Sequence, residues 1–219
     1  MKALSARRPA GLVLALLALA SFGAAPLPAQ AAPARGLFLV ASDNLGDPNF
    51  YQTVVLLLDY SEQGALGLIV NRPTAVSLAE LFPKTAAVAA RKQDRVYLGG
   101  PVEREQVRLL LRRRGPAEGF ERVAGDLYSG GEIAALAELL ASDNPPTAVR
   151  GYAGYAGWGP GQLDREIEQG AWLVLQSSAD QVFDPQPEGL WRRLFDGAQM
   201  RFARAAPKAK ISPALAAFE

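Results

Sequence analysis

The chain of 219 residues contains no histidine and no cysteine. Without these residues it can build no Ser-His-Asp or Cys-His nucleophilic site, no thiol redox centre and almost no kind of zinc site. Any catalysis would have to use carboxylates, Lys, Tyr, Arg or backbone groups. Disulfides are excluded too, so stability in an oxidising compartment would come from packing alone.

The first 31 residues have the three-part layout of a secretory signal peptide. Lys2, Arg7 and Arg8 form a positive segment, and Gly11–Phe22 is an apolar run of 12 residues. Ala29-Gln30-Ala31 supplies the small-x-small pattern that a signal peptidase needs. Because the run is shorter than the roughly 20 residues that span a bilayer, we expect cleavage after Ala31 and no remaining transmembrane segment. The sequence therefore predicts a periplasmic or secreted protein.

The part after the signal is predicted to be one domain, residues 32–204, followed by a flexible tail, residues 205–219, rich in Ala, Pro and Lys. Its length suits a single hydrophobic core. Without the three basic residues of the signal, 20 basic and 22 acidic residues remain, a formal charge of −2. Such a balance leaves no electrostatic footprint for nucleic acid, which we do not expect as a partner. No metal and no cofactor are expected either.

Short apolar runs between turn residues predict strands, and apolar residues at helical spacing predict helices. The expected strands are Gly36–Ala41, Gln52–Asp59, Ala65–Val70, Val96–Leu98, Gln106–Arg112, Phe120–Val123, Asp126–Tyr128 and Trp172–Leu175, with another beginning at Val149. The expected helices are Leu78–Phe82, Gly131–Ala141, Gly161–Gln169 and Glu188–Phe195. In the strand before Gly115, Arg108 and Arg112 are expected to point outward. Hairpins mixed with strand-helix alternation predict an α/β domain of the α+β type, with one mixed sheet flanked by helices.

The segment Gly151–Gly161 (GYAGYAGWGPG) is the most unusual one. Its glycines permit positive φ and close backbone approach, and it leads into a helix at Gln162 whose first amides could hold an anion. It is neither a Walker A loop nor a dinucleotide fingerprint. The alternative is a tight strand-to-helix turn that only packs Tyr152, Tyr155 and Trp158.

Acidic side chains leave two chemical hypotheses open. Asp43, Asp47 and Asp59 could be oxygen ligands for a hard cation, although Asp-Asn and Asp-Pro pairs are ordinary turn chemistry. Asp164 and Glu168 share a helix face beside the glycine-rich segment and could do acid/base work, or could simply be solvated. The serines have no histidine to activate them.

Four sequence blocks in order resemble the AlgH/YqgE family of bacterial proteins. They are Gly36–Ala41 with Asp47–Phe50 and Val54–Val55; Gly64–Pro73; Val96–Val102; and Gly154–Leu163, continuing through Glu166–Ile167 to Gly170–Trp172. The resemblance implies a single domain with a largely antiparallel, barrel-like sheet flanked by helices. It implies no established enzymatic activity, and a regulatory role linked to one branch. Members are generally cytoplasmic, which is the alternative to export, and Tyr60 and Arg112 stand where the family often has histidine.

We therefore expect a non-enzymatic binding or regulatory domain in the cell envelope, with a small anion or an envelope protein as its partner. The alternatives are a hydrolase or transferase near the glycine-rich segment, and a transcription-linked regulator by family analogy. The expected binding surface lies where strand ends meet. It comprises Asn71, Arg72, Gly99, Gly100, Gly154, Gly157, Trp158, Gly161 and Gln162. Arg72 would either hold an anion or lock the fold by pairing with Asp164 or Glu166.

Overall fold

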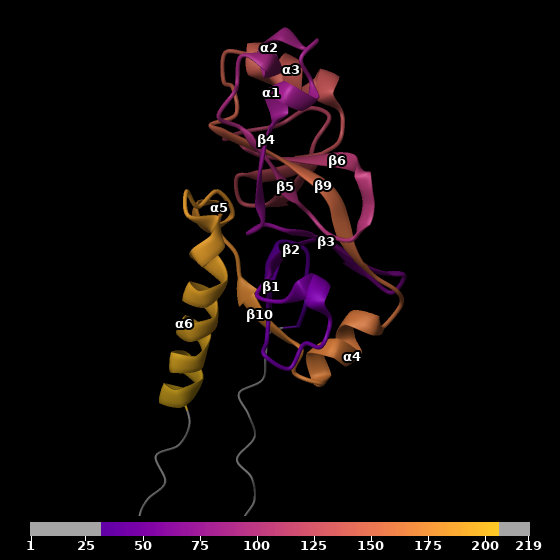
Figure 1. Cartoon of the computed structure of the whole chain (residues 1–219), viewed down its shortest axis with the longest axis vertical. Coiled ribbons are helices and arrows are strands. Elements are labelled where there is room, and N and C mark those ends of the chain that lie inside the picture. The colour runs from indigo at the N-terminus through magenta and orange to yellow at the C-terminus, as the bar shows by residue number, and fades with distance from the viewer. Residues whose placement is uncertain (1–31, 206–219) are drawn as a thin grey trace, which may run out of the picture.

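The computed structural model describes residues 32–205, which form one strongly curled sheet with helices around it (Figure 1). The predicted signal peptide and residues 206–219 of the predicted tail lie outside the described residues. The strands are β1 Leu37–Ala41, β2 Val54–Ser61, β3 Gly64–Ile69, β4 Pro73–Ser77, β5 Arg95–Leu98, β6 Val102–Arg112, β7 Glu121–Ala124, β8 Leu127–Gly130, β9 Ala148–Trp158 and β10 Trp172–Gln176. The helices are α1 Leu78–Leu81, α2 Ala86–Ala89, α3 Ile133–Ala141, α4 Gln162–Glu168, α5 Ala179–Val182 and α6 Leu190–Ala205, with 3₁₀ turns at Pro48–Phe50 and Pro187–Gly189.

The sheet order is β10-β1-β2-β3-β9-β6-β8-β7, with β4 paired to β5 and β5 paired to β9. All pairs are antiparallel except the parallel pair of β5 and β9. The predicted hairpin of β2 and β3 is confirmed, as is the predicted fold class of a mixed, largely antiparallel sheet flanked by helices. One parallel pair in an otherwise antiparallel sheet explains why the sequence shows both hairpins and strand-helix alternation.

The concave face of the sheet carries the main core. This cluster joins Phe38 of β1 to Val123 of β7, which lie near opposite ends of the strand order. Only a sheet that curls into a half-barrel can bring these strands together. The curl nearly closes, because a side chain on Gly36 would lie 2.8 Å from the Cβ of Ala124. Helix α6 stands beside β1 and β10 (Figure 1) and adds Leu190 and Trp191 to this core.

Two smaller clusters cover the convex side. One packs α4 against β1, β2 and β10 through Leu163 and Trp172. The other packs α1, α2 and α3 at the far end, through Leu78, Val88 and Leu136. No helix within residues 32–205 is both long and apolar enough to cross a membrane.

The glycine-rich segment is not the tight turn that the sequence suggests. It is most of β9, an eleven-residue strand that pairs with β3, β5 and β6. Its glycines allow close approach: a Cβ on Gly100 would lie 2.1 Å from the carbonyl carbon of Tyr155. Gly154, with φ 72°, lies at a bulge where the register between β6 and β9 shifts, between Val102 and Val107 of β6. This bulge shifts the side-chain alternation by one residue, so Tyr152 faces the concave core before it and Tyr155 after it.

Two further sequence predictions need correction. The last helix was expected to end at Phe195, but α6 continues to Ala205, a residue that the tail was expected to include. Arg108 was expected to point outward, yet it alternates with Leu110, which lies in the concave core. Alternate strand residues share a face, so Arg108 is directed to the concave side.

Candidate functional site

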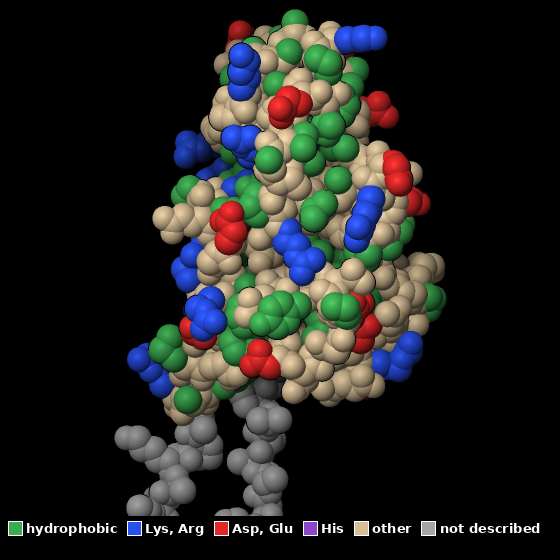
Figure 2. Space-filling view, viewed as in Figure 1, with side chains coloured by type: hydrophobic (Ala, Val, Ile, Leu, Met, Phe, Trp, Pro, Cys, Tyr) green, Lys and Arg blue, Asp and Glu red, His purple; other side chains and the backbone are tan. Residues whose placement is uncertain are grey.

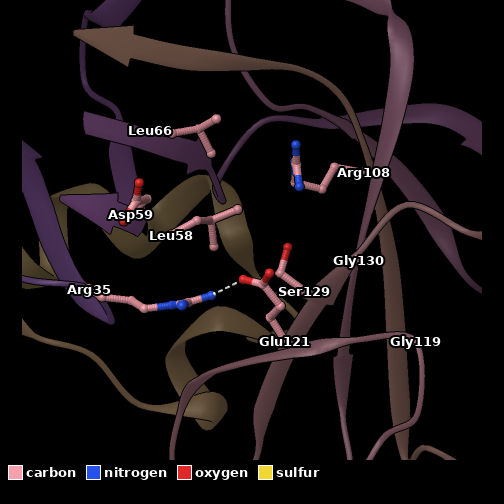
Figure 3. Close-up of a pocket in the computed structure, with 9 residues that line it drawn as sticks. All are labelled: Arg35, Leu58, Asp59, Leu66, Arg108, Gly119, Glu121, Ser129 and Gly130. Carbon is pink, nitrogen blue, oxygen red and sulfur yellow. Dashed lines mark hydrogen bonds and ion pairs between the residues drawn. The ribbon is translucent and has the colours of Figure 1, made fainter. Parts of the chain in front are cut away.

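A cavity of about 390 Å³ opens at one end of the concave face, where β2 and β3 approach β6, β7 and β8 (Figure 3). Leu58 and Leu66 form its apolar wall, and Arg35, Asp59, Arg108, Glu121 and Ser129 supply its polar groups. Mouths of barrel-like sheets and cavities of this volume are common ligand sites. The cavity therefore is the strongest candidate site among the described residues.

Strand alternation places Arg108 and Ser129 in the cavity. Ser129 follows Leu127 by two residues on β8, and Leu127 lies in the concave core. Ser129 is paired in register with Leu110 of β6, two residues beyond Arg108. Diagonal neighbours on one face of a sheet lie within reach of long side chains. Figure 3 shows the Ser129 hydroxyl and the Arg108 guanidinium reaching into the same space.

The Ser129 hydroxyl has no hydrogen-bond partner within the described part of the chain, although the residue is only 6% exposed. Arg108 likewise makes no hydrogen bond or ion pair with another described residue and is half-buried. A buried polar group without a partner costs about 1–3 kcal/mol of stability. The cavity thus holds two donors that are free to bind a ligand.

The two acidic side chains of the cavity differ in whether they are already paired with a basic residue. Glu121 is paired with Arg35 at 2.6 Å on the cavity rim (Figure 3). Asp59 lies across the cavity from Arg108, and no described residue pairs with its carboxylate. A bulge in β2 between Leu57 and Asp59 puts Asp59 in register with Leu66 and turns it to the concave face. The carboxylate of Asp59 therefore is the free acceptor of the site.

The predicted surface separates into two parts in the structure. Its first part does come together: Leu98 N–H donates to the carbonyl of Arg72, and Ile69 N–H donates to Gly99. Gly99 and Gly154 are also in contact, since a Cβ on Gly99 would lie 2.3 Å from the Gly154 carbonyl oxygen. The second part, Gly157 to Gln162, lies further along β9 and at the start of α4.

Asn71 and Arg72 hold the backbone together. The Asn71 side chain accepts from Val54 N–H at 2.9 Å and donates to the Gln52 carbonyl at 3.0 Å. Arg72 donates to the carbonyls of Asn49 and Tyr51 at 2.7 and 3.0 Å, and burial lowers its pKa. Arg72 therefore locks a loop, as one sequence hypothesis held, but through these carbonyls and not through Asp164 or Glu166.

Hydrogen bonds from the protein's own side chains surround the start of α4. The Gln162 side chain accepts from Gly159 N–H at 3.1 Å. Trp158 is buried against Phe50 and Trp172, and its indole N–H donates to Glu166. Glu166 also accepts from Trp172 and Gln162. These contacts give Gln162 and Trp158 structural roles in docking α4 onto the sheet.

The remaining acids that the sequence singled out are also occupied or isolated. Asp164 accepts from the Tyr60 hydroxyl at 2.6 Å, and this hydrogen bond raises the pKa of Tyr60. Asp47 accepts from Asn49 N–H and caps the 3₁₀ turn. Within residues 32–205, no group of three or more acidic residues could hold a metal ion. Asp47, Asp164 and Glu166 therefore serve turns and packing, Asp43 and Glu168 are exposed, and Asp59 is the acid of this set that lines the cavity.

Sequence reasoning missed Arg108 and Ser129 as site residues. The sequence signal that could have identified them is a polar residue two positions from an apolar core residue on the same strand, since such residues share a face. Arg108 stands in this relation to Leu110, and Ser129 to Leu127. Using that signal requires knowing which of the two alternating sets of residues on each strand faces the concave core.

The comparisons with known proteins agree with the fold described here. The sequence model of the AlgH-like family, DUF179, matches residues 38–203. The chain belongs to the AlgH-like family. A UPF0301 protein of Myxococcus xanthus is 41% identical over 155 residues, covering 70% of this chain and 84% of the relative. A UPF0301 protein of Streptomyces coelicolor is 41% identical over 165 residues, covering 73% and 83%.

Two solved structures are similar to this AlgH-like chain. The solution structure of AlgH from Pseudomonas aeruginosa matches with a TM-score of 0.60 and 32% identity, covering 79% of this chain and 93% of that one. The crystal structure of a Corynebacterium diphtheriae protein matches with a TM-score of 0.70 and 25% identity, covering 80% and 92%. The family and its fold are thereby established, while its biochemical function is uncharacterised.

Proposed function

We propose that this AlgH-like domain is a non-enzymatic binding or regulatory protein that takes a small anion in the concave cavity. One observation carries the proposal: the buried Ser129 hydroxyl faces the same space as Arg108, and neither has a partner among residues 32–205. An anion between them would accept a hydrogen bond from each. Hydrogen bonds from a guanidinium to an anion are about twice as strong as those between neutral groups.

The chemistry of the cavity favours binding over catalysis. A serine nucleophile needs an adjacent base, and no described residue is hydrogen-bonded to the Ser129 hydroxyl. Of the two carboxylates considered for acid/base work, Asp164 is held by the Tyr60 hydroxyl and Glu168 is exposed on α4, outside the cavity. The groups left free in the cavity are donors and one acceptor, which suits recognition.

Ser129→Ala is expected to separate binding from stability. Without ligand, the variant should be as stable as the wild type or slightly more stable, because it removes a buried hydroxyl that has no partner. With inorganic phosphate or acetate at millimolar concentration, the melting temperature of the wild type should rise, since a ligand stabilises the state that it binds. That rise should be lost in Ser129→Ala and in Arg108→Gln, as followed by thermal unfolding and isothermal calorimetry.

The matched control is Arg104→Gln, an exposed arginine of the same strand, which should respond to anions as the wild type does. Two results would contradict the proposal. One is a wild type that neither phosphate nor acetate stabilises or binds. The other is Ser129→Ala unfolding at a lower temperature than the wild type without ligand, which would mark the hydroxyl as a structural group.

We also propose that the domain works in the cell envelope after removal of residues 1–31. The support is the three-part signal pattern that ends at Ala29-Gln30-Ala31. The intact mass of protein recovered from the periplasm is expected to correspond to a chain that begins at Ala32. Full-length protein found only in the cytoplasm would exclude export.

A further inference from the structure

We infer that the natural ligand is elongated, with one anionic end, hydroxyl groups in its middle and a flat ring at its other end, as in a nucleoside monophosphate. This inference rests on the proposed function, because it places the anionic end between Arg108 and Ser129. It adds a second cavity, which adjoins the first and has a different chemical character.

The second cavity has a volume of about 420 Å³ and shares Asp59 and Leu66 with the first. It continues along the concave side to Tyr155 and Gly157 of β9 and to Val102 at the start of β6. Leu66 of β3 is in register with both Asp59 and Gly157, so one strand connects the two cavities. A ligand that crosses Leu66 can therefore occupy both cavities at once.

Asp59 determines the middle of the ligand. Its carboxylate borders both cavities, and no described residue pairs with it. An ionised carboxylate only accepts hydrogen bonds, so the ligand must offer donors such as hydroxyl groups at this point. The same negative charge repels a second anionic group. The anionic group of the ligand is thereby confined to the Arg108 end.

Tyr155 supplies a platform for the ring. The bulge at Gly154 turns Tyr155 to the concave side, where it is half-buried. A Cβ on Gly157 would lie 3.2 Å from Cε2 of Tyr155, so the absence of a side chain there lets the ring lie against the strand. An aromatic ring supported on one side can stack a flat ligand ring on the other. Stacking of one base on an aromatic side chain typically strengthens binding about 5- to 150-fold.

The test compares four probes with the folded domain by calorimetry: inorganic phosphate, ribose 5-phosphate, adenosine 5′-monophosphate and adenosine. Affinity should rise in the order phosphate, ribose 5-phosphate, adenosine 5′-monophosphate, and adenosine should bind more weakly than its monophosphate. Asp59→Asn should reduce the gain that the ribose gives. Tyr155→Leu should lower the affinity for adenosine 5′-monophosphate to that for ribose 5-phosphate. Tyr155→Phe, which keeps the aromatic ring, should keep the wild-type affinity. The pair of variants thus tests whether the ring itself is responsible.

Matched controls are Tyr51→Leu and Asp43→Asn, at exposed positions away from both cavities, which should leave all affinities unchanged. If phosphate binds and the nucleotide binds no tighter, the ligand is not elongated and the inference is wrong, while the anion site stands. If Arg108→Gln leaves nucleotide binding intact, the anionic end is misplaced and the inference is wrong. If none of the four probes binds, both the inference and the phosphate site fail.

Discussion

Asn71 illustrates how a single side chain can serve structure where the sequence predicts a site. Its amide replaces a missing pair of backbone contacts, accepting from Val54 N–H and donating to the Gln52 carbonyl. Gln52 has φ 53°, a left-handed conformation that is unfavourable for a residue with a side chain. The two hydrogen bonds of Asn71 help to hold this conformation.

Asn71→Ala is expected to lower the free energy of unfolding by about 1–3 kcal/mol, because it leaves the buried Val54 N–H without an acceptor. Asn71→Asp keeps the acceptor but buries a carboxylate against the Gln52 carbonyl, so its loss should be at least as large near pH 7. Urea denaturation measures both. Asn44→Ala, in an exposed loop, serves as the control, and an Asn71→Ala variant within 0.5 kcal/mol of wild type would refute the structural role.

At the scale of elements, the short helix α1 depends on its first turn. Glu80 accepts from the backbone N–H and the hydroxyl of Ser77, and Ser77 in turn accepts from Glu80 N–H. This reciprocal capping box lowers the pKa of Glu80, chiefly through the hydrogen bond from the Ser77 backbone. The ionised form of Glu80 is therefore the form that the fold favours.

Glu80→Gln should consequently show a pH-dependent effect. The stabilisation that wild-type Glu80 contributes is present above the ordinary glutamate pKa of about 4.3 and is lost as the pH falls through its lower folded pKa. The difference in unfolding free energy between wild type and variant should be largest near neutral pH and shrink below about pH 4. Glu138→Gln, at an exposed position of α3, is the matched control, and a difference between wild type and Glu80→Gln that is independent of pH would contradict the assignment.

Local sequence patterns predicted the strands whose pairing partners lie nearby in the sequence. The apolar runs predicted β1, β2 and β3 within a few residues, because alternation and turn residues are local signals. They predicted a strand that begins at Val149, but not that β9 continues through the glycine-rich segment to Trp158, since glycine weakens isolated strands. These glycines are needed because β9 pairs with three strands, β3, β5 and β6, and the backbone at Gly99 and Gly100 packs closely against it. A contact of this kind cannot be read from one segment.

The cavity was harder to predict than the strands, because its residues are assembled by curvature. Arg108, Ser129 and Asp59 come from three strands, and the Asp59 side chain turns inward only because β2 bulges beside it. A shift of one residue in register moves a side chain to the other face. In the first part of the predicted surface, Arg72, Gly99 and Gly154 do lie close together, while their role in binding stays a prediction.

At the scale of the whole molecule, one buried cation attaches the segment in and after α5 to the sheet. Arg150 of β9 is 8% exposed and donates to the carbonyls of Val182 and Asp184, in and after α5. Its guanidinium also lies 4.5 Å from the centre of the Tyr97 ring. Charges of both signs are scattered over the face shown in Figure 2, whereas the charge of Arg150 is buried.

Arg150→Lys is expected to destabilise the domain by about 1.5–3 kcal/mol for each charged hydrogen bond that it loses, because an ammonium cannot both stack and donate in a planar fork. Urea denaturation gives the size of the loss. Hydrogen exchange should show amides of Leu190–Ala205 losing protection first, since that helix follows the detached segment. The same substitution at exposed Arg201 on α6 should have no effect. Equal loss of protection throughout the sheet would argue against local detachment.

The position of β1 between β10 and β2 has a consequence for how the polypeptide acquires its structure. β1 pairs on one side with β2, its neighbour along the chain, but on the other side with Trp172–Gln176. The second pairing closes a loop of more than a hundred residues, which is slow because long-range contacts gain nothing until the entropy of closure has been met. During synthesis, one edge of β1 must therefore wait for nearly the entire domain to emerge. For the export that we propose, such a delay would help to keep the chain unfolded until it has crossed the membrane.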